Sequence, residues 1–329
     1  MGMALAESVI ARHAKRLGGH ARRVTIDLDP TDDPTHGAQQ LSFFNSHYDN
    51  ACYLPMMGFV TFNDEADQYL CAAVLRPGNV TAAAGAVGIL RRLMALIRNS
   101  FPNARIRVRL NGGFSNPELL AFLDGERGVE YAVAMASPPR RAVLERKAGE
   151  AMQYARAMAG VTEQTEHVYG EANYAAGTWK WERRVIVKAE VVRAEGKAPK
   201  DNPRFVITNM KQTPQWLYEQ VYCQRGEIEN RIKELHALEI DRTSCTRFWA
   251  NQFRVLLTVA AYVLMQELRL QAALTECARA QVWTLRERFL KLGARVMVSM
   301  RRVVVHLPQS FPFLAAFRQI AMGLGASPG

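Results

Sequence analysis

The amino-acid sequence predicts an α/β fold in which a mixed sheet is flanked by helices. Strand-like, helical and strand-like patterns follow one another over residues 68–76, 81–100 and 104–110, which is typical of an α/β layer. An alternating strand is predicted over residues 21–29, and an amphipathic helix over residues 222–241 carries a stripe of charged side chains. These charged positions are the first candidates for function.

Charge and composition narrow the class of partner. The 329 residues allow one large or two small domains, and the hydrophobic content of 49% is ordinary for a globular protein. The net charge of +11 favours a polyanionic partner such as nucleic acid, although a generically basic protein would share it.

The cysteines and the apolar runs of the sequence indicate the cellular compartment of the protein. Five cysteines, widely spaced and without a C-x-x-C pair, argue against a zinc ribbon or a disulfide framework and indicate a reducing compartment. The longest apolar run, residues 255–265, is too short to span a bilayer, and residues 1–19 lack the apolar region of a signal peptide. We therefore expect a cytoplasmic protein with no membrane association.

A short helix over residues 4–17 precedes the strand at 21–29. This strand places apolar side chains on one face and Thr25, Asp27 and Asp29 on the other. Two acids on an apolar-backed strand are costly unless they are solvated, paired or bound to metal. An exposed edge strand or a helix cap are the plain alternatives.

The strand at 104–110 ends in Asn111-Gly112-Gly113-Phe114, and a helix then begins. A residue at the carboxyl end of a sheet strand, followed by glycines, commonly grips a ligand or metal. A further strand at 125–135 and a basic helix at 137–159 complete this part.

Residues 162–208 form a β-rich segment in which aromatic and basic side chains interleave. Such a surface can stack a base and hold phosphates, although a core tryptophan with solvated edge cations would give the same pattern. The side chains concerned are Trp179, Trp181, Arg183, Arg184 and Lys188.

The predicted helix at 222–241 places Tyr222, Arg225, Glu229 and His236 on one face. This can be a solvated charged face. Alternatively, Glu229 is a metal ligand and Arg225 a phosphate clamp, which requires acids from elsewhere in the chain.

A long helix follows at 246–270, and the sequence pattern predicts that one of its faces packs in the core. The residues on that face are Phe248, Trp249, Phe253, Leu256, Leu257, Ala260 and Leu264. A helix at 278–293, a basic strand-like stretch at 295–307 and a helix at 313–324 end the chain. This basic end either contacts DNA or is a solvated surface.

The spacing Tyr222-x2-Arg225-x3-Glu229 resembles the signature helix of bacterial insertion-sequence transposases of the DDE type. The block from VTIDLD through THGAQQ to CYLPM resembles the first conserved block of the same family. The resemblance implies an RNase H-like catalytic domain interrupted by a β insertion. It implies Asp29 as the first catalytic acid, with Asp27 as the close alternative. The family often adds a lysine seven residues after the glutamate, where this chain has His236, with Lys233 one turn earlier.

The activity that the resemblance implies is metal-dependent cleavage at a transposon end, followed by attack of the freed 3′-hydroxyl on target DNA. Mg²⁺ or Mn²⁺ would be held by Asp29, Asn111 and Glu229, and double-stranded DNA by Tyr222 and Arg225. Lys233, His236 and the Trp179 to Arg184 surface are further candidate DNA contacts. A homodimer, or pairing with a full-length transposase, and association with the nucleoid are also implied.

Two departures from the family pattern affect this expectation. Arg109-Leu110-Asn111-Gly112-Gly113-Phe114 keeps the frame Arg-x-Asp-x-Gly-Phe but has an amide in place of the acid. Because Asn is neutral, we expect loss of most metal-dependent activity. Only a short helix precedes Asp27, so we also expect an N-terminally truncated form. The alternative function is therefore a silent remnant that binds DNA or inhibits a full-length transposase, and an unrelated RNase H-like nuclease ranks last.

These interpretations predict five segments. They are an N-terminal helix at 1–20, a first RNase H-like part at 21–160, a β-rich insertion at 161–208, the rest of the RNase H-like domain at 209–270, and a helical, basic segment at 271–329.

Overall fold

The computed structural model describes residues 2–135, 142–308 and 310–326. The chain divides into two compact units. The first comprises residues 1–32 and 41–229, and the second comprises residues 33–40 and 230–329. Each unit is described by itself.

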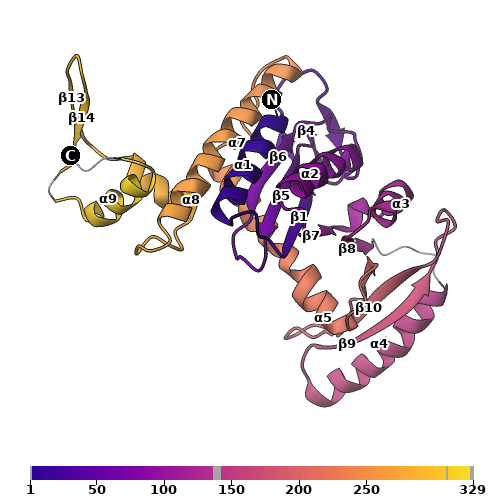
Figure 1. The fold of residues 1–329 in the computed structure, drawn as a ribbon. Coiled ribbons are helices and arrows are strands. Elements are labelled where there is room, and N and C mark those ends of the chain that lie inside the picture. The colour runs from indigo at the N-terminus through magenta and orange to yellow at the C-terminus, as the bar shows by residue number, and fades with distance from the viewer. Residues whose placement is uncertain (1, 136–141, 309, 327–329) are drawn as a thin grey trace. The chain divides into compact units, whose positions relative to one another are not determined.

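A mixed sheet forms the centre of the first unit (Figure 1). Its strand order β6-β5-β1-β7-β8 pairs β1 antiparallel to β5 and parallel to β7, and β7 is parallel to β8. This order and these directions are those of an RNase H-like fold, as predicted. The strands are β1 (Arg23–Pro30), β5 (Met56–Phe62), β6 (Tyr69–Val74), β7 (Arg105–Leu110) and β8 (Val129–Met135).

The predicted β-rich segment extends this same sheet. Its strand β12 pairs antiparallel with β8, and β10 then pairs with β12, β9 and β11. Helix α4 (Ala142–Thr162) packs against β9 and β10; residues 137–141 of the predicted helix lie outside the described residues. The strands are β9 (Glu166–Tyr174), β10 (Arg183–Val192), β11 (Lys200–Asp201) and β12 (Arg204–Thr208).

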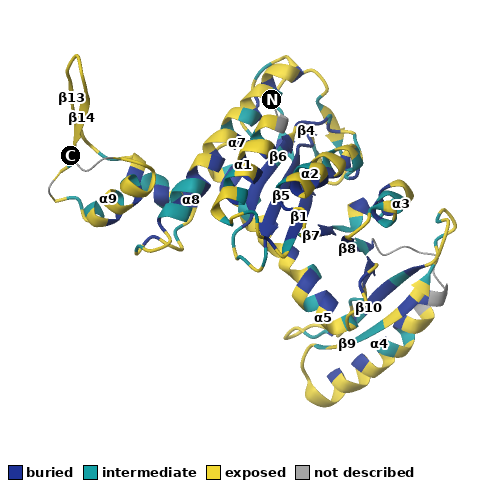
Figure 2. Cartoon of the chain, in the orientation of Figure 1, coloured by how far each residue is buried: buried dark blue, intermediate teal, exposed yellow. Residues whose placement is uncertain are grey.

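The alternation in β1 separates the two faces of the sheet. Leu28 lies against Gly58 and Leu93, so the apolar face of β1 packs under helix α2 (Ala86–Ser100). Asp27 and Asp29 therefore lie on the opposite face. Figure 2 shows the central strands buried. The remaining elements before residue 130 are α1 (Gly2–Arg16), β2 (Asp33–Pro34), β3 (Phe43–Asn45), β4 (Asn50–Tyr53), η1 (Gly112–Phe114) and α3 (Pro117–Gly125).

The helix predicted from residue 222 is not a regular α-helix at its start. A short α-helical turn α5 (Pro214–Trp216) leads into a π-helix η2 (Leu217–Tyr222), a 3-10 turn η3 (Cys223–Gly226), and only then α6 (Glu227–Ala237). Changes of helix type inside one segment are frequent at functional sites. The regular α-helical spacing i, i+3, i+7 predicted for Tyr222, Arg225 and Glu229 is therefore wrong.

In the second unit, the buried carboxylate of Glu234 is an organising centre. It accepts a hydrogen bond from the Tyr262 hydroxyl at 2.7 Å and pairs with Arg269 at 2.8 Å. Arg231 pairs with the same carboxylate at 3.2 Å. A buried charge needs such partners to offset its lost hydration. The elements are the end of α6, α7 (Phe248–Gln271), α8 (Val282–Leu285), η4 (Arg286–Leu290), β13 (Arg295–Val298), β14 (Val303–His306) and α9 (Leu314–Gly323).

Helix α7 buries a different face from the one predicted. Its buried side carries the polar residues Asn251, Gln266 and Arg269, whereas four large apolar residues of the predicted core face are exposed. Asn251 binds both backbone groups of Cys245, which holds the helix in this rotation. The exposed residues are Trp249, Phe253, Leu257 and Leu264.

The length and apolar composition of α7 are those of a helix that could cross a membrane. By length and composition, it is the one helix among the described residues that is apolar enough to cross a membrane, and 39% of the apolar window is buried. Its buried polar side chains and the Arg269–Glu234 pair are features of a core helix.

We predict that Gly78→Ala destabilises the first unit. A Cβ at residue 78 would lie 2.1 Å from the carbonyl oxygen of Cys52 and 2.5 Å from that of Phe43, so the backbone of β3 or β4 must move. The expected loss is about 2 kcal/mol or more of unfolding free energy, measured by urea unfolding. The control Gly88→Ala, on α2 with open space around it, should gain about 0.5 kcal/mol. Equal stability of both variants would contradict the prediction.

Candidate active site

Asp27, one of the two acids predicted on β1, forms its ion pair and hydrogen bonds with buried groups inside the protein. It is completely buried and forms a two-point ion pair with Arg109, whose Nε and Nη2 lie 2.8 and 2.6 Å from its oxygens. Gln68 donates a third hydrogen bond at 3.1 Å. Such a pair satisfies the buried charge on both sides. Asp27 is therefore a structural residue in this arrangement.

Arg109 also connects the sheet to the helical segment that follows β12. Its Nη1 donates to the backbone carbonyl of Val221 at 3.3 Å, in the π-helix η2. Four residues later, Arg225 extends to the end of β1. The Asp27–Arg109 pair thus fixes the position of the segment that supplies Arg225.

Asp29 lies two residues beyond Asp27 and is brought together with Asn111 and Arg225. Its Oδ1 accepts a hydrogen bond from Asn111 Nδ2 at 2.7 Å, and Arg225 Nη2 lies 2.7 Å from the same oxygen. Asp29 is 8% exposed and Arg225 9%. The carboxyl ends of the parallel strands β1 and β7 therefore meet, with Asp29 at the end of one and Asn111 after the other.

The orientation of the Asn111 amide is fixed by its neighbours. Its Oδ1 accepts from the backbone N–H of Gly113 at 3.0 Å and caps the turn η1, so its NH₂ group faces Asp29. The loop is tightly packed, because a Cβ at Gly113 would lie 2.7 Å from Ala82. The amide serves two partners that an acid could not serve together, since a carboxylate has no N–H to donate.

Glu229, the third predicted acid, is exposed on α6. The pKa of Asp29 is raised to about 6, chiefly by burial and to a smaller extent by the charges of Glu229 and Asp27, while Arg225 acts in the opposite direction. Glu229 is thus close enough to act on Asp29 electrostatically.

The divalent ions that the resemblance implies require a particular set of ligands. Mg²⁺ and Mn²⁺ take oxygen ligands, and carboxylates supply the charge that offsets two cations. Here Asn111 presents an N–H donor, and Oδ1 of Asp29 already accepts from an amide and a guanidinium. Among the described residues, no three His, Cys, Asp or Glu side chains come together as ligands. The residues as arranged do not fit the metal pair.

Tyr222, Lys233 and His236 are the other predicted residues of the 222–236 stretch. Tyr222 packs its ring 5.5 Å from that of Tyr218, beside an apolar cluster, and burial raises its pKa. Lys233 and His236 belong to the second unit, where His236 contacts Asp241 at 3.3 Å.

The aromatic and basic surface before and within β10 is largely an internal structure. Arg183 is buried, lies 4.8 Å from the Trp179 ring and 5.4 Å from the Trp181 ring, and pairs with Asp124 at 2.7 Å. Arg184 pairs with Glu171 and donates to two backbone carbonyls. Trp181 remains 46% exposed. The sequence pattern identified the cations but not Asp124, because that acid lies far away in the chain.

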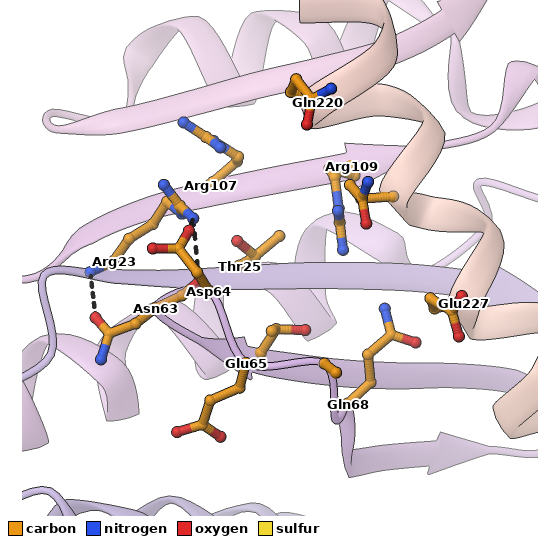
Figure 3. Close-up of a pocket in the computed structure, with 13 residues that line it drawn as sticks. Arg23, Thr25, Asn63, Asp64, Glu65, Gln68, Arg107, Arg109, Gln220 and Glu227 are labelled. Atoms are coloured by element: carbon orange, nitrogen blue, oxygen red, sulfur yellow. Dashed lines mark hydrogen bonds and ion pairs between the residues drawn. The ribbon is translucent and has the colours of Figure 1, made fainter.

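A polar cavity of about 410 Å³ lies on the same face of the sheet as Asp27. Figure 3 shows Arg107 and Arg109 of β7 near Thr25 of β1, with Gln220 and Glu227 from the helical segment. Arg107 pairs with Glu130 at 2.7 Å, so both arginines are held by acids. Sequence reasoning did not identify this cavity, because its lining comes from separate parts of the chain.

The chain was compared with known proteins. A family model described as "Transposase DDE domain group 1" matches residues 1–328. No curated protein sequence matches the chain. The family match therefore covers both compact units and includes all three positions of the predicted acids.

We predict that Asp27 and Asp29 differ in their effect on stability. Asp27→Asn leaves Arg109 buried without its counter-charge and should cost about 3–5 kcal/mol. Asp29→Asn should cost less than half as much at pH 7.5, because burial already disfavours the charged form of Asp29. Urea unfolding of both variants measures the difference. A larger loss for Asp29→Asn would contradict the assignment of Asp27 as the structural acid.

The raised pKa of Asp29 predicts that the stability of the protein depends on pH. The pKa of Asp29 rises from 3.8 to about 6 on folding, so its stabilising effect is complete below pH 3.8 and is lost as pH rises through 6. The stability of Asp29→Asn relative to that of wild type should therefore increase as pH rises from 4.5 to 7.5. Asp64→Asn, an exposed acid, is the control. A flat difference for Asp29→Asn would show that its pKa is not raised.

Proposed function

This chain belongs to group 1 of the transposase DDE domain family, and we propose that it binds transposon-end and target DNA while its strand cleavage is weak or absent. The observation that carries the proposal is the Asn111 amide donating to Asp29 at 2.7 Å. The family pattern has an acid at position 111. Here the Asn111 amide instead forms hydrogen bonds within the protein, to Asp29 and to the backbone of Gly113.

The charge of the cluster supports weak cleavage. Asp29 contributes one negative charge, Arg225 one positive charge, and Asn111 none. Phosphoryl transfer of this class generally uses Mg²⁺ or Mn²⁺ held by several carboxylates. A neutral, internally bonded set attracts such ions poorly. Glu229 is the acid that remains exposed for a ligand role.

DNA binding is supported independently of cleavage. The net charge of +11 favours a polyanion. Arg225 and Tyr222 lie beside the candidate site, and Lys233, His236 and exposed Trp181 are further candidate contacts. Arg183 and Arg184 serve in internal pairs, and Arg183 also lies 5.4 Å from the ring of Trp181. We place the protein in the cytoplasm with the nucleoid, without membrane association.

The second candidate function is that of a catalytically silent partner. Such a chain would occupy transposon ends, or pair with itself or with an active transposase, and so inhibit transposition. The closed Asn111–Asp29–Arg225 cluster favours it, because the central sheet is formed while an amide stands where the chemistry needs an acid.

We predict that Asn111→Asp creates a site that depends on a divalent cation. Two carboxylates would then face each other at the end of β1, which should cost about 1–3 kcal/mol without a cation. Added Mg²⁺ or Mn²⁺ should restore the thermal stability of Asn111→Asp and leave wild type unchanged. In a cleavage assay on transposon-end DNA, the variant should be active and wild type should be inactive or nearly so.

Asn116→Asp is the matched control. Asn116 caps helix α3 through a hydrogen bond to the N–H of Leu119 at 2.8 Å, a role that Asp fills equally well. Its stability should not respond to Mg²⁺. Robust cleavage by wild type would show that residue 111 is not the second acidic position of the site. Inactivity of Asn111→Asp, with DNA binding intact, would favour the silent-partner function.

A further inference from the structure

The hairpin of β13 and β14 in the second unit is exposed on both faces. Val296 pairs with Val305 and Val298 with Val303, and every residue of the two strands is exposed. Figure 1 shows a narrow ribbon with its turn at the free end, and Figure 2 shows the same strands as exposed. A two-stranded hairpin alone is marginally stable in water, so contact with a partner would stabilise it.

The turn of the hairpin presents an apolar and two basic side chains. Ser299 and Arg302 close it through a backbone hydrogen bond of 2.9 Å and through the Ser299 hydroxyl. Met300, at the turn, is fully exposed, and Arg301 and Arg302 are exposed beside it. Within the described part of the chain, neither arginine has an ion-pair partner. Their charges are therefore available to a partner.

The end of the chain is basic, and of its cations Lys291 pairs with Glu287. After Glu287, the sequence contains no Asp or Glu. The cations in this stretch are Arg288, Lys291, Arg295, Arg301, Arg302 and Arg318. A polyanion complements this charge, whereas a second copy of the same segment would offer only like charges.

We infer that the β13–β14 hairpin is a separate DNA-binding arm that lies in the major groove of duplex DNA. The major groove, about 12 Å wide, accepts a two-stranded β-ribbon. Arg301 and Arg302 would contact phosphates at the tip, and the valine face formed by residues 296, 298, 303 and 305 would contact apolar groups such as thymine methyls. The inference rests on the proposed DNA-binding function and adds a site remote in sequence from Asp29.

The test is equilibrium binding of the full chain to a labelled 30-base-pair duplex of mixed sequence, by fluorescence anisotropy over a range of salt concentrations. Arg301→Ala with Arg302→Ala should weaken binding at least about tenfold. It should also reduce the slope of log K against log salt by about 2, since each lost phosphate contact removes about 0.9. The wild-type chain should protect guanine N7, a major-groove atom, from methylation by dimethyl sulfate, and the double variant should lose this protection.

The matched control is Arg91→Ala with Arg92→Ala. These exposed arginines lie on α2, which covers the face of the sheet opposite to Asp29, and the change removes the same net charge. The control should retain the wild-type slope and change affinity less than about threefold.

The remaining outcomes distinguish the proposed DNA-binding arm from its alternatives. If wild type binds DNA and the arm variant behaves as the control does, the arm is refuted and the DNA-binding function stands. If wild type binds no duplex, both fail. Should Val298→Thr with Val305→Thr change the molar mass in light scattering while the arginine variant binds DNA normally, the hairpin contacts a second copy of the chain. Binding without protection of N7 would exclude the major groove.

Discussion

The buried ion pair between Asp27 and Arg109 is the interaction on which the candidate site depends. A carboxylate with no exposed surface is tolerable only because a guanidinium meets both of its oxygens and Gln68 adds a further donor. The same guanidinium reaches the Val221 carbonyl in the π-helix. One charged group therefore joins β1, β7 and the helical segment that supplies Arg225. The geometry around Asp29 follows from this connection.

Folding and chemistry place separate demands on the two acids of β1. Asp27 is committed to the interior, while Asp29 lies at the strand end, where its raised pKa reflects burial that only a cation or a donor can offset. In this chain, Asn111 and Arg225 are those donors. A family member can thus keep its fold and its net positive charge while an amide stands beside the acid at the end of β1.

The second unit distributes charge and apolar surface in an unusual way. Buried polar side chains, with Glu234 as their centre, determine how α7 is rotated, and large apolar residues such as Trp249 and Leu257 are left exposed. Further along, a ribbon without acids projects its arginines. The interior of this unit is thus held by specific hydrogen bonds and ion pairs as well as by apolar packing.

The sequence by itself determined the order of strands and helices, the two acids on one face of β1, and the loop at Asn111 after β7. These follow from local alternation and from glycines at a strand end, which neighbouring residues are enough to specify. Only the tertiary structure decided that Asp27 pairs with Arg109, that Arg225 turns to Asp29 through an irregular helix, and that α7 buries Asn251 instead of Trp249. Each of these depends on a partner outside the local pattern, and the free energy of a buried polar group is set by that partner.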